Sequence, residues 1–196
     1  MRPRDENKEL LIRQKAMEII VKHGLDGFSI SKLAKAANVS PATIYIYYKD
    51  KDDLITKLCL EVAWQMINCS LKDFSPEMDF DIGLRIQWQN RMQYFINFPT
   101  EMEFIEIMRY TNYYEEVSRA LTTNFGSVLG PFMENSIQKK QLISLPFEVY
   151  WSVAFAPLYQ LIKYHYQGSS HVNSTFKLDD KMMMQTLELV LKALKP

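Results

Sequence analysis

The sequence predicts an all-α protein. Glycine is scarce, with 6 among 196 residues, and 47% of the residues are apolar. This composition suits long helices around a sizeable core and leaves little room for hairpin turns. Along most of the chain, apolar residues recur every three or four positions, as in amphipathic helices. We expect an N-terminal domain of residues 1–54 with three helices and a larger helical domain of residues 55–196.

The first helix is expected from Asn7 to His23, because apolar residues follow helical spacing there and Gly24 suits a helix end. Before it, residues 1–6, with Arg2 and Arg4, are expected to form a mobile arm.

The segment from Phe28 to Leu54 predicts two short helices, a tight turn between them, and the start of a longer helix. Asn38 stands at the reversal and tolerates a left-handed backbone. Ser40 is a suitable N-cap, and Pro41 suits the first helical position. These features indicate a helix-turn-helix, whose second helix fits the major groove of DNA.

The outer face of this segment carries hydroxyl and ammonium groups. We expect the serines at the start of the first short helix to contact phosphate, the start of the second to face base edges, and the tyrosines and lysines to contact the DNA backbone. The tyrosines have a simpler alternative role as packing aromatics. The candidate DNA-binding residues are Ser29, Ser31, Ser40, Pro41, Ala42, Thr43, Tyr45, Tyr47, Lys49 and Lys51.

Net charge is zero, but it is unevenly distributed. Residues 1–51 hold ten Lys and Arg against six Asp and Glu, and the rest holds thirteen against seventeen. A basic N-terminal part and an acidic remainder suit a DNA-binding end and a body that avoids DNA.

The helix that begins at Lys51 is expected to run to about Lys72, so no flexible linker separates the two domains. Helices are then expected at Phe80–Phe98, Thr100–Tyr110 and Tyr114–Gln141, the last with a kink at Gly130-Pro131. A continuous connecting helix offers a route by which a change in the body moves the DNA-binding end.

The middle helices are rich in methionine and aromatic residues, which predicts an apolar cavity for a small apolar or aromatic effector. A well-filled helical core is the alternative. The candidate pocket residues are Trp88, Met92, Phe95, Phe104, Met108, Phe125, Leu129, Tyr150 and Phe155. The candidate polar contacts are Gln87, Asn90, Arg91 and Tyr113.

The last two helices are expected at Leu145–Gln167 and Leu178–Leu194. The first is apolar almost all round, which favours cover by a second subunit in a four-helix interface. The candidate interface residues are Trp151, Leu158, Ile162, Met183, Leu187, Val190 and Leu191.

The N-terminal pattern resembles the TetR family of bacterial transcription regulators. The matching residues are His23-Gly24, Phe28-Ser29-Ile30, Leu33-Ala34, Ala37, Val39-Ser40, Thr43-Ile44-Tyr45, Tyr47-Tyr48, Lys51 and Leu54. Asn38 departs from the usual Gly and Tyr48 from a frequent Phe. The resemblance covers roughly the first quarter to third of the chain. It implies an all-helical homodimer that binds a palindromic operator, most often as a repressor, and releases it when a small molecule enters the C-terminal domain.

Two other classes were weighed: a small-molecule-binding protein without DNA regulation, and an enzyme. Three scattered histidines, with no nucleophile elbow, phosphate loop or metal-ligand cluster, argue against an enzyme. We therefore expect no catalytic residue, metal or cofactor.

Cys59 and Cys69 lie ten residues apart on one predicted helix, too far for a bridge, so free thiols are expected, with redox sensing left open. The charged N-terminus and short apolar runs predict no signal peptide and a cytoplasmic protein.

Overall fold

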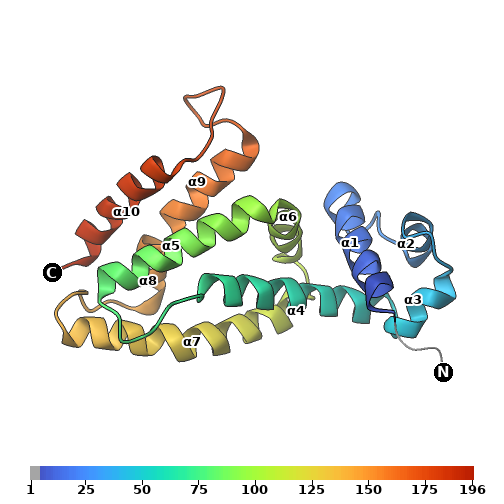
Figure 1. Cartoon of the computed structure of the whole chain (residues 1–196), viewed down its shortest axis with the longest axis horizontal. Coiled ribbons are helices and arrows are strands. Elements are labelled where there is room, and N and C mark those ends of the chain that lie inside the picture. Colours follow the sequence, from blue (N-terminus) through green and yellow to red (C-terminus); the bar gives the residue numbers. More distant parts are fainter. Residues whose placement is uncertain (1–4) are drawn as a thin grey trace. The chain divides into compact units, whose positions relative to one another are not determined.

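The structure is a computed structural model that describes residues 5–196 (Figure 1). Helices account for all of its regular secondary structure in this range, so the predicted all-α fold is confirmed. The expected arm with Arg2 and Arg4 lies outside the described residues. The helices are α1 Glu6–His23, α2 Ile30–Ala36, α3 Pro41–Tyr47, α4 Lys51–Ser70, α5 Phe80–Asn97, α6 Pro99–Met108, α7 Tyr114–Gln138, α8 Phe147–Ala154, α9 Ala156–Gln167 and α10 Asp180–Leu194.

The helices form two compact units. The N-terminal unit comprises the described residues through Gln65 together with Phe98–Leu121. The C-terminal unit comprises Met66–Asn97 and Thr122–Pro196. The chain passes from one unit to the other at three points: within α4, between α5 and α6, and within α7. Among residues 5–196, no helix has an apolar stretch long enough to cross a bilayer.

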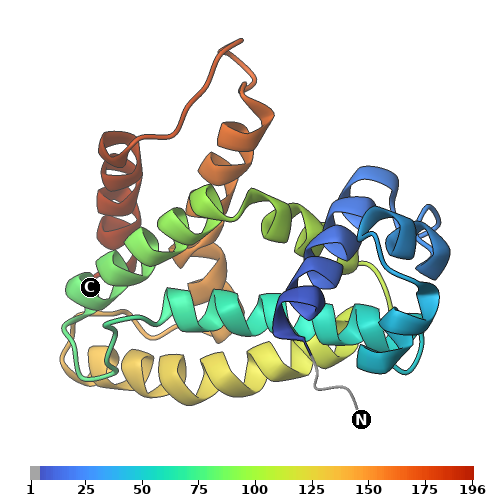
Figure 2. The ribbon, with the colours of Figure 1, turned by 45° about the vertical axis from the view of Figure 1, so that its right-hand side comes forward.

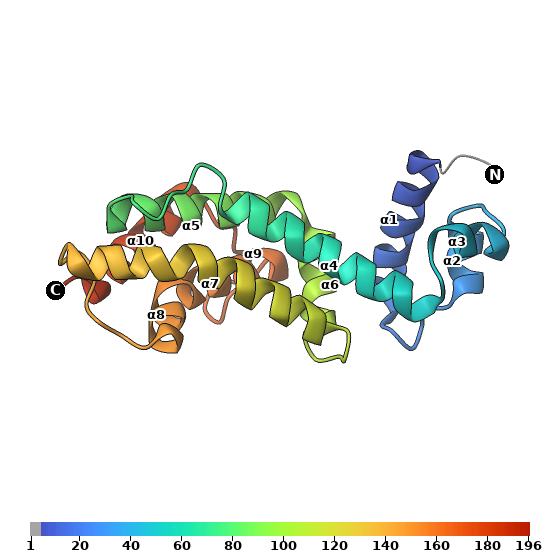
Figure 3. The same cartoon turned by 90° about the horizontal axis from the view of Figure 1, so that it is seen from below.

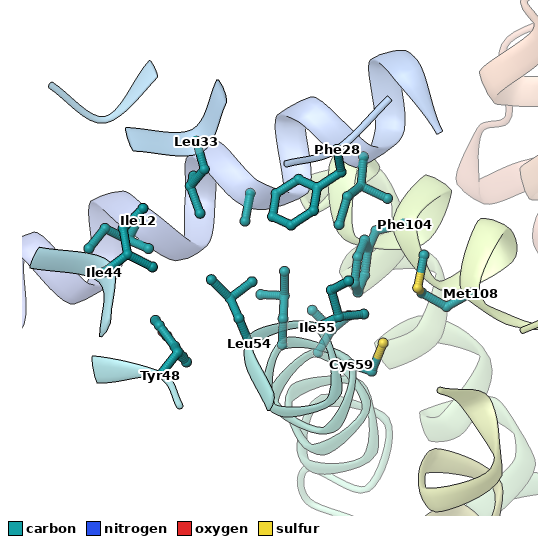
Figure 4. Close-up of a cluster of buried hydrophobic side chains, with 14 of the residues drawn as sticks. Ile12, Phe28, Leu33, Ile44, Tyr48, Leu54, Ile55, Cys59, Phe104 and Met108 are labelled. Atoms are coloured by element: carbon teal, nitrogen blue, oxygen red, sulfur yellow. The ribbon is translucent and has the colours of Figure 1, made fainter. Parts of the chain in front are cut away.

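The N-terminal unit is built around side chains that the helical pattern predicts to be buried. Ile12 of α1, Leu33 of α2, Ile44 of α3 and Leu54 of α4 are all 0% exposed and belong to one apolar cluster (Figure 4). Asp5 caps α1, and Gly24 ends it with a φ of 69°, where a residue with a side chain would be strained.

Helix α6 also belongs to the N-terminal unit and packs on α1. Its Phe104 and Met108 are fully buried in the same cluster as Ile55 and Cys59 (Figure 4). The prediction that Phe104 and Met108 line a pocket with the other middle-helix residues is therefore revised. They are core residues of the N-terminal unit, which sequence spacing alone did not reveal.

In the C-terminal unit, α5 and α10 pack on α9, and α10 also contacts α8 (Figure 2). Trp151 of α8 packs on Phe125, near the middle of α7, with their ring centroids 6.0 Å apart. Figure 3 shows the backbones of these two helices. At Gly83 of α5, an added Cβ would lie 2.6 Å from the ring of Phe132, so α5 and α7 approach closely there.

One long helix was predicted where the structure has α8 and α9. The chain breaks at Phe155, with a φ of −125°, two residues before Pro157. Proline has no amide hydrogen and clashes with the carbonyl four residues earlier, which favours a break before Pro157. By contrast, α7 remains helical through Pro131.

Six of the seven residues predicted for the dimer interface are already buried within a single chain. Leu158, Ile162, Met183, Leu187, Val190 and Leu191 are at most 5% exposed within a single chain. The helix that seemed to need a partner is covered by α5 and α10 of its own chain. Trp151 is partly buried and packs on Phe125 and Phe155.

Candidate nucleic-acid interface

Each short segment of the N-terminal unit begins with a side chain that caps its helix. The Ser29 hydroxyl accepts the amide of Lys32 at the start of α2, and the Ser40 hydroxyl accepts the amide of Thr43 at the start of α3, both at 3.2 Å. The Asp50 carboxylate accepts the amide of Asp53 at 2.8 Å at the start of α4. These caps satisfy donors that the helix itself cannot pair.

The turn between α2 and α3 has the backbone that the sequence predicts. Asn38 has a φ of 53°, in the left-handed region. The amide of Val39 then donates to the carbonyl of Ala34 at 2.9 Å and closes the turn. Helices α2 and α3 pack on each other, and α2 packs on α1, which gives the helix-turn-helix arrangement (Figures 1 and 2).

The outer face of α3 is partly apolar. Ile44 is fully buried, whereas Tyr45 is 54% and Ile46 is 59% exposed. Pro41 and Ala42 are also exposed. Ile46 is not among the predicted DNA-binding residues. Helical spacing nevertheless predicts its exposure, because a residue two positions after buried Ile44 points about 200° away around the helix.

Tyr47 differs from its prediction. It was placed on the outer face, but it is 6% exposed. Its hydroxyl accepts the amide of Asp5 at 3.2 Å and donates to the Asp5 carbonyl at 3.1 Å. Tyr47 therefore ties the end of α3 to the start of α1, as in the packing alternative. Tyr48 is buried, and its burial raises the pKa of its phenol.

The two candidate lysines have different surroundings. Lys49 is exposed, and Lys51 is partly buried. The Lys51 ammonium donates to the carbonyl of Phe28 at 3.3 Å and lies 5.7 Å from the centre of its ring. Ser31 is exposed, and Thr43 shares a 2.9 Å hydrogen bond with the Ser40 hydroxyl.

Asp53 organises the start of α4. Its carboxylate accepts Nζ of Lys57 and the amide of Lys49, each at 2.9 Å. These two hydrogen bonds, with Lys57 the larger cause, lower the pKa of Asp53. The first amides of α4 have no intrahelical acceptor by geometry, so this helix start is suited to a phosphate.

Most of the predicted pocket residues lie in the C-terminal unit. Gln87 and Arg91, among the predicted polar contacts, are fully buried there. The amide of Asn90 instead donates to the carbonyls of Ser70 and Lys72. Tyr113 is in the N-terminal unit, where its hydrogen bond to Asp52 raises its pKa to about 12. The pocket candidates buried in the C-terminal unit are Trp88, Met92, Phe95, Phe125, Leu129, Tyr150 and Phe155.

A groove of about 330 Å³ lies in the C-terminal unit, and it includes Met92 of the predicted pocket residues and Asn90 of the predicted polar contacts. Its lining residues are Gln89, Asn90, Met92, Gln93, Asp180, Met183 and Met184. Within residues 5–196, no group of three or more His, Cys, Asp or Glu side chains is placed to hold a metal ion.

The sequence of residues 12–58 matches the family described as "Bacterial regulatory proteins, tetR family". This match covers α3, its turn and the start of α4. The N-terminal part of the chain therefore carries the helix-turn-helix sequence of this family. A TetR family transcription regulator from Marinobacter aquaeolei VT8 has the same fold, with a TM-score of 0.84 and 26% identity over 100% of this chain and 99% of that one.

One further structure is similar in fold, and two curated sequences are similar over part of their length. A TetR family protein from Vibrio parahaemolyticus shares the fold at a TM-score of 0.76 and 22% identity, over 96% of this chain and 99% of that one. An uncharacterized HTH-type transcriptional regulator of Haemophilus influenzae is 34% identical over 82 residues, 42% of this chain and 44% of the relative. A fatty acid metabolism regulator protein of Bacillus subtilis is 38% identical over 70 residues, 36% of each. The match thus spans less than half the length of these curated relatives.

Proposed function

We propose that this chain is a DNA-binding transcription regulator of the TetR family that acts as a homodimer on a palindromic operator. The observation that carries the proposal is the outer face of α3, where Tyr45 and Ile46 are more than half exposed on a helix capped and oriented by a helix-turn-helix. An α-helix of this kind fits the major groove, and paired copies read half-sites about one helical turn apart.

The contacts divide by chemistry. Pro41, Ala42 and Ile46 offer apolar contact to thymine methyl groups, and Tyr45 offers a hydroxyl beside them. Ser31, Lys49 and the start of α4 are suited to phosphates, since they are polar and at or near the surface. Four further residues are proposed to lie beside the DNA while also forming hydrogen bonds within the N-terminal unit. They are Ser29, Ser40, Thr43 and Lys51. Tyr47 is proposed to contribute indirectly, because its hydrogen bonds to the backbone of Asp5 hold the end of α3 in position.

The regulation is proposed to be negative and relieved by a small effector in the C-terminal unit. Helix α4 is continuous from Lys51 to Ser70 and belongs to both units, which supports coupling between them. The Bacillus subtilis relative is named as a regulator, which supports the regulatory role. With no membrane-crossing helix among residues 5–196, a cytoplasmic location is proposed.

The subunit contact is proposed to use exposed apolar side chains rather than the buried ones first predicted. Leu189 of α10 is 66% exposed, and Phe147 and Val149 of α8 are each 44% exposed. Sedimentation of Leu189→Glu is expected to show a monomer where the parent chain is a dimer. A dimer that persists in this variant contradicts the contact.

Fluorescence anisotropy with a labelled duplex from the region upstream of the gene tests DNA binding. Tyr45→Ala is expected to weaken binding about tenfold or more. Lys49→Ala is expected to lower the slope of log affinity against log salt by about one. Lys192→Ala, which removes the same charge from α10, is the control and leaves both unchanged. Absence of salt-dependent binding by the parent chain, or equal losses in the control, contradicts the proposal.

A further inference from the structure

Arg91 is a buried charge at the centre of the C-terminal unit. It is 0% exposed, on a helix that also buries Trp88 and Phe95. Its guanidinium carbon lies 4.4 Å from the ring centre of Phe155, 5.1 Å from that of Phe125 and 5.4 Å from that of Trp151. The group is therefore enclosed by aromatic rings on several sides.

This guanidinium has one hydrogen-bond partner. Its Nη1 donates to the hydroxyl of Tyr159 at 2.8 Å. Its Nε and Nη2 are buried without a hydrogen-bond acceptor. Among residues 5–196, no carboxylate forms an ion pair with Arg91, whereas Arg85 on the same helix pairs with Glu188 at 2.9 Å.

Two neighbouring polar side chains also have buried atoms without a hydrogen-bond partner. Gln87 lies one helical turn before Arg91 on the same face of α5, and both its Nε2 and its Oε1 are buried without a partner. The hydroxyl of Tyr150 is likewise buried and unpaired. The Tyr150 ring packs edge-on against Phe155 at 6.2 Å between centroids, and the Arg91 guanidinium carbon lies 4.4 Å from the centre of that same Phe155 ring. Three fully buried side chains in this region thus hold five unpaired polar atoms.

Burial of such groups is unfavourable unless something compensates for it. An arginine stays protonated in proteins, so it cannot relieve its burial by losing a proton. Buried polar groups in native proteins are nearly always paired, and buried charges are paired with an opposite charge. The rings give the cation partial stabilisation but accept none of its in-plane N–H groups.

The unpaired atoms are mostly donors. The two guanidinium nitrogens and the Gln87 amide donate. The Tyr150 hydroxyl also donates, because burial raises its pKa and keeps it protonated. A group complementary to them is anionic and offers several acceptor lone pairs, and a carboxylate matches a guanidinium with two parallel hydrogen bonds.

We propose that the C-terminal unit binds an organic acid, with its carboxylate on Arg91, Gln87 and Tyr150 and its apolar body among the surrounding aromatic side chains. This inference rests on the proposed function, since the acid is then the effector that releases DNA. A buried water bridging the same atoms is the competing occupant, and it would confer no preference for an anion.

Isothermal titration calorimetry and thermal melting with benzoate, hydrocinnamate and decanoate test the proposal, each beside the uncharged amide of the same skeleton. At least one acid is expected to bind the full chain and raise its melting temperature, about tenfold more tightly than its amide. Arg91→Met is expected to abolish that preference, and Tyr150→Phe to reduce it. Arg85→Met, a matched change on the exposed side of α5, leaves it intact.

The ligand-free melting temperature gives a second measurement. If Arg91 lacks its partner in the free protein, Arg91→Met melts at a higher temperature than the parent chain, because an unpaired buried charge is replaced by an apolar group of similar length. Failure of every acid to bind in preference to its amide overturns the proposal, as does an unchanged preference in Arg91→Met. DNA binding by the ligand-free chain, measured on the same samples, separates this outcome from failure of the proposed function.

Discussion

Two arginines show how the units differ. Arg13 in the N-terminal unit has a side chain that is 25% exposed and forms an ion pair with Glu61 of α4. Arg91 in the C-terminal unit is fully buried and has no anionic partner among residues 5–196. In the N-terminal unit, the Glu61 carboxylate pairs with Arg13. In the C-terminal unit, no carboxylate among residues 5–196 pairs with Arg91.

This difference indicates two kinds of design. In the N-terminal unit, the caps of α2, α3 and α4 and the turn before α3 are completed by residues nearby in the sequence. In the C-terminal unit, which we propose binds a ligand, unsatisfied polar groups among aromatic side chains make stability dependent on what binds.

The core of the N-terminal unit is tested by two isoleucines of α3. Ile44→Ala removes a fully buried side chain and is expected to lower the free energy of unfolding by about 2–5 kcal/mol. Ile46→Ala removes one that is 59% exposed, with an expected change within about 0.5 kcal/mol but weaker DNA binding. Denaturant titration and anisotropy measure the two effects. Similar stability losses in both variants contradict the described burial.

The arginine contrast predicts opposite signs. Arg91→Met is expected to raise the stability of the ligand-free protein by about 1–4 kcal/mol, since it removes an unpaired buried charge. Arg13→Met is expected to lower it by up to about 1 kcal/mol, since it breaks a partly exposed pair. Denaturant titration of both variants in the same buffer measures the two changes in the free energy of unfolding. If both substitutions destabilise the protein, Arg91 already has a partner in the ligand-free state. That result contradicts the proposed difference between the two arginines.

Two serines separate capping from DNA contact. Ser40→Ala removes the cap of α3 and is expected to cost about 1 kcal/mol of stability along with DNA affinity. Ser31→Ala lies on the exposed side of α2 and caps no helix, so it is expected to lose affinity at nearly unchanged stability. Thermal melting and anisotropy on the same samples are the measurements. Loss of stability in Ser31→Ala shows that its role is structural.

The smallest expected effect concerns pH. The folded-state pKa of Asp53 is lowered, so its contribution is present above the unfolded pKa and is lost as pH falls through the folded pKa. Asp53→Asn is therefore expected to be less stable than the parent chain at neutral pH, by about 0.5 kcal/mol. The gap should close below about pH 4. A gap that is constant from neutral to acidic pH contradicts the role of the Asp53 carboxylate.

Local rules explain which parts of the fold were predictable. The caps at Ser29, Ser40 and Asp50 and the left-handed Asn38 follow from residue type and position, and the structure has all of them. The break before Pro157 was predictable from the missing amide hydrogen, but an almost continuous apolar run concealed it.

The errors arose where burial depends on residues distant in sequence. Phe104 and Leu187 are equally apolar at helical spacing, and spacing does not say which helix covers them. Tyr47 looked like a surface hydroxyl because its partner, the backbone of Asp5, lies 42 positions away. Arg91 was predicted only as a polar contact, since nothing in the sequence shows that a charge lacks a partner.

The central claim is that α3 enters the major groove of DNA. Dimethyl sulfate footprinting on the upstream duplex tests it directly, because the reagent methylates guanine N7 on the floor of that groove. The account predicts two protected patches about one helical turn, or about 10 base pairs, apart, both lost in Tyr45→Ala. DNA binding without guanine protection, or protection that persists in this variant, would contradict the account.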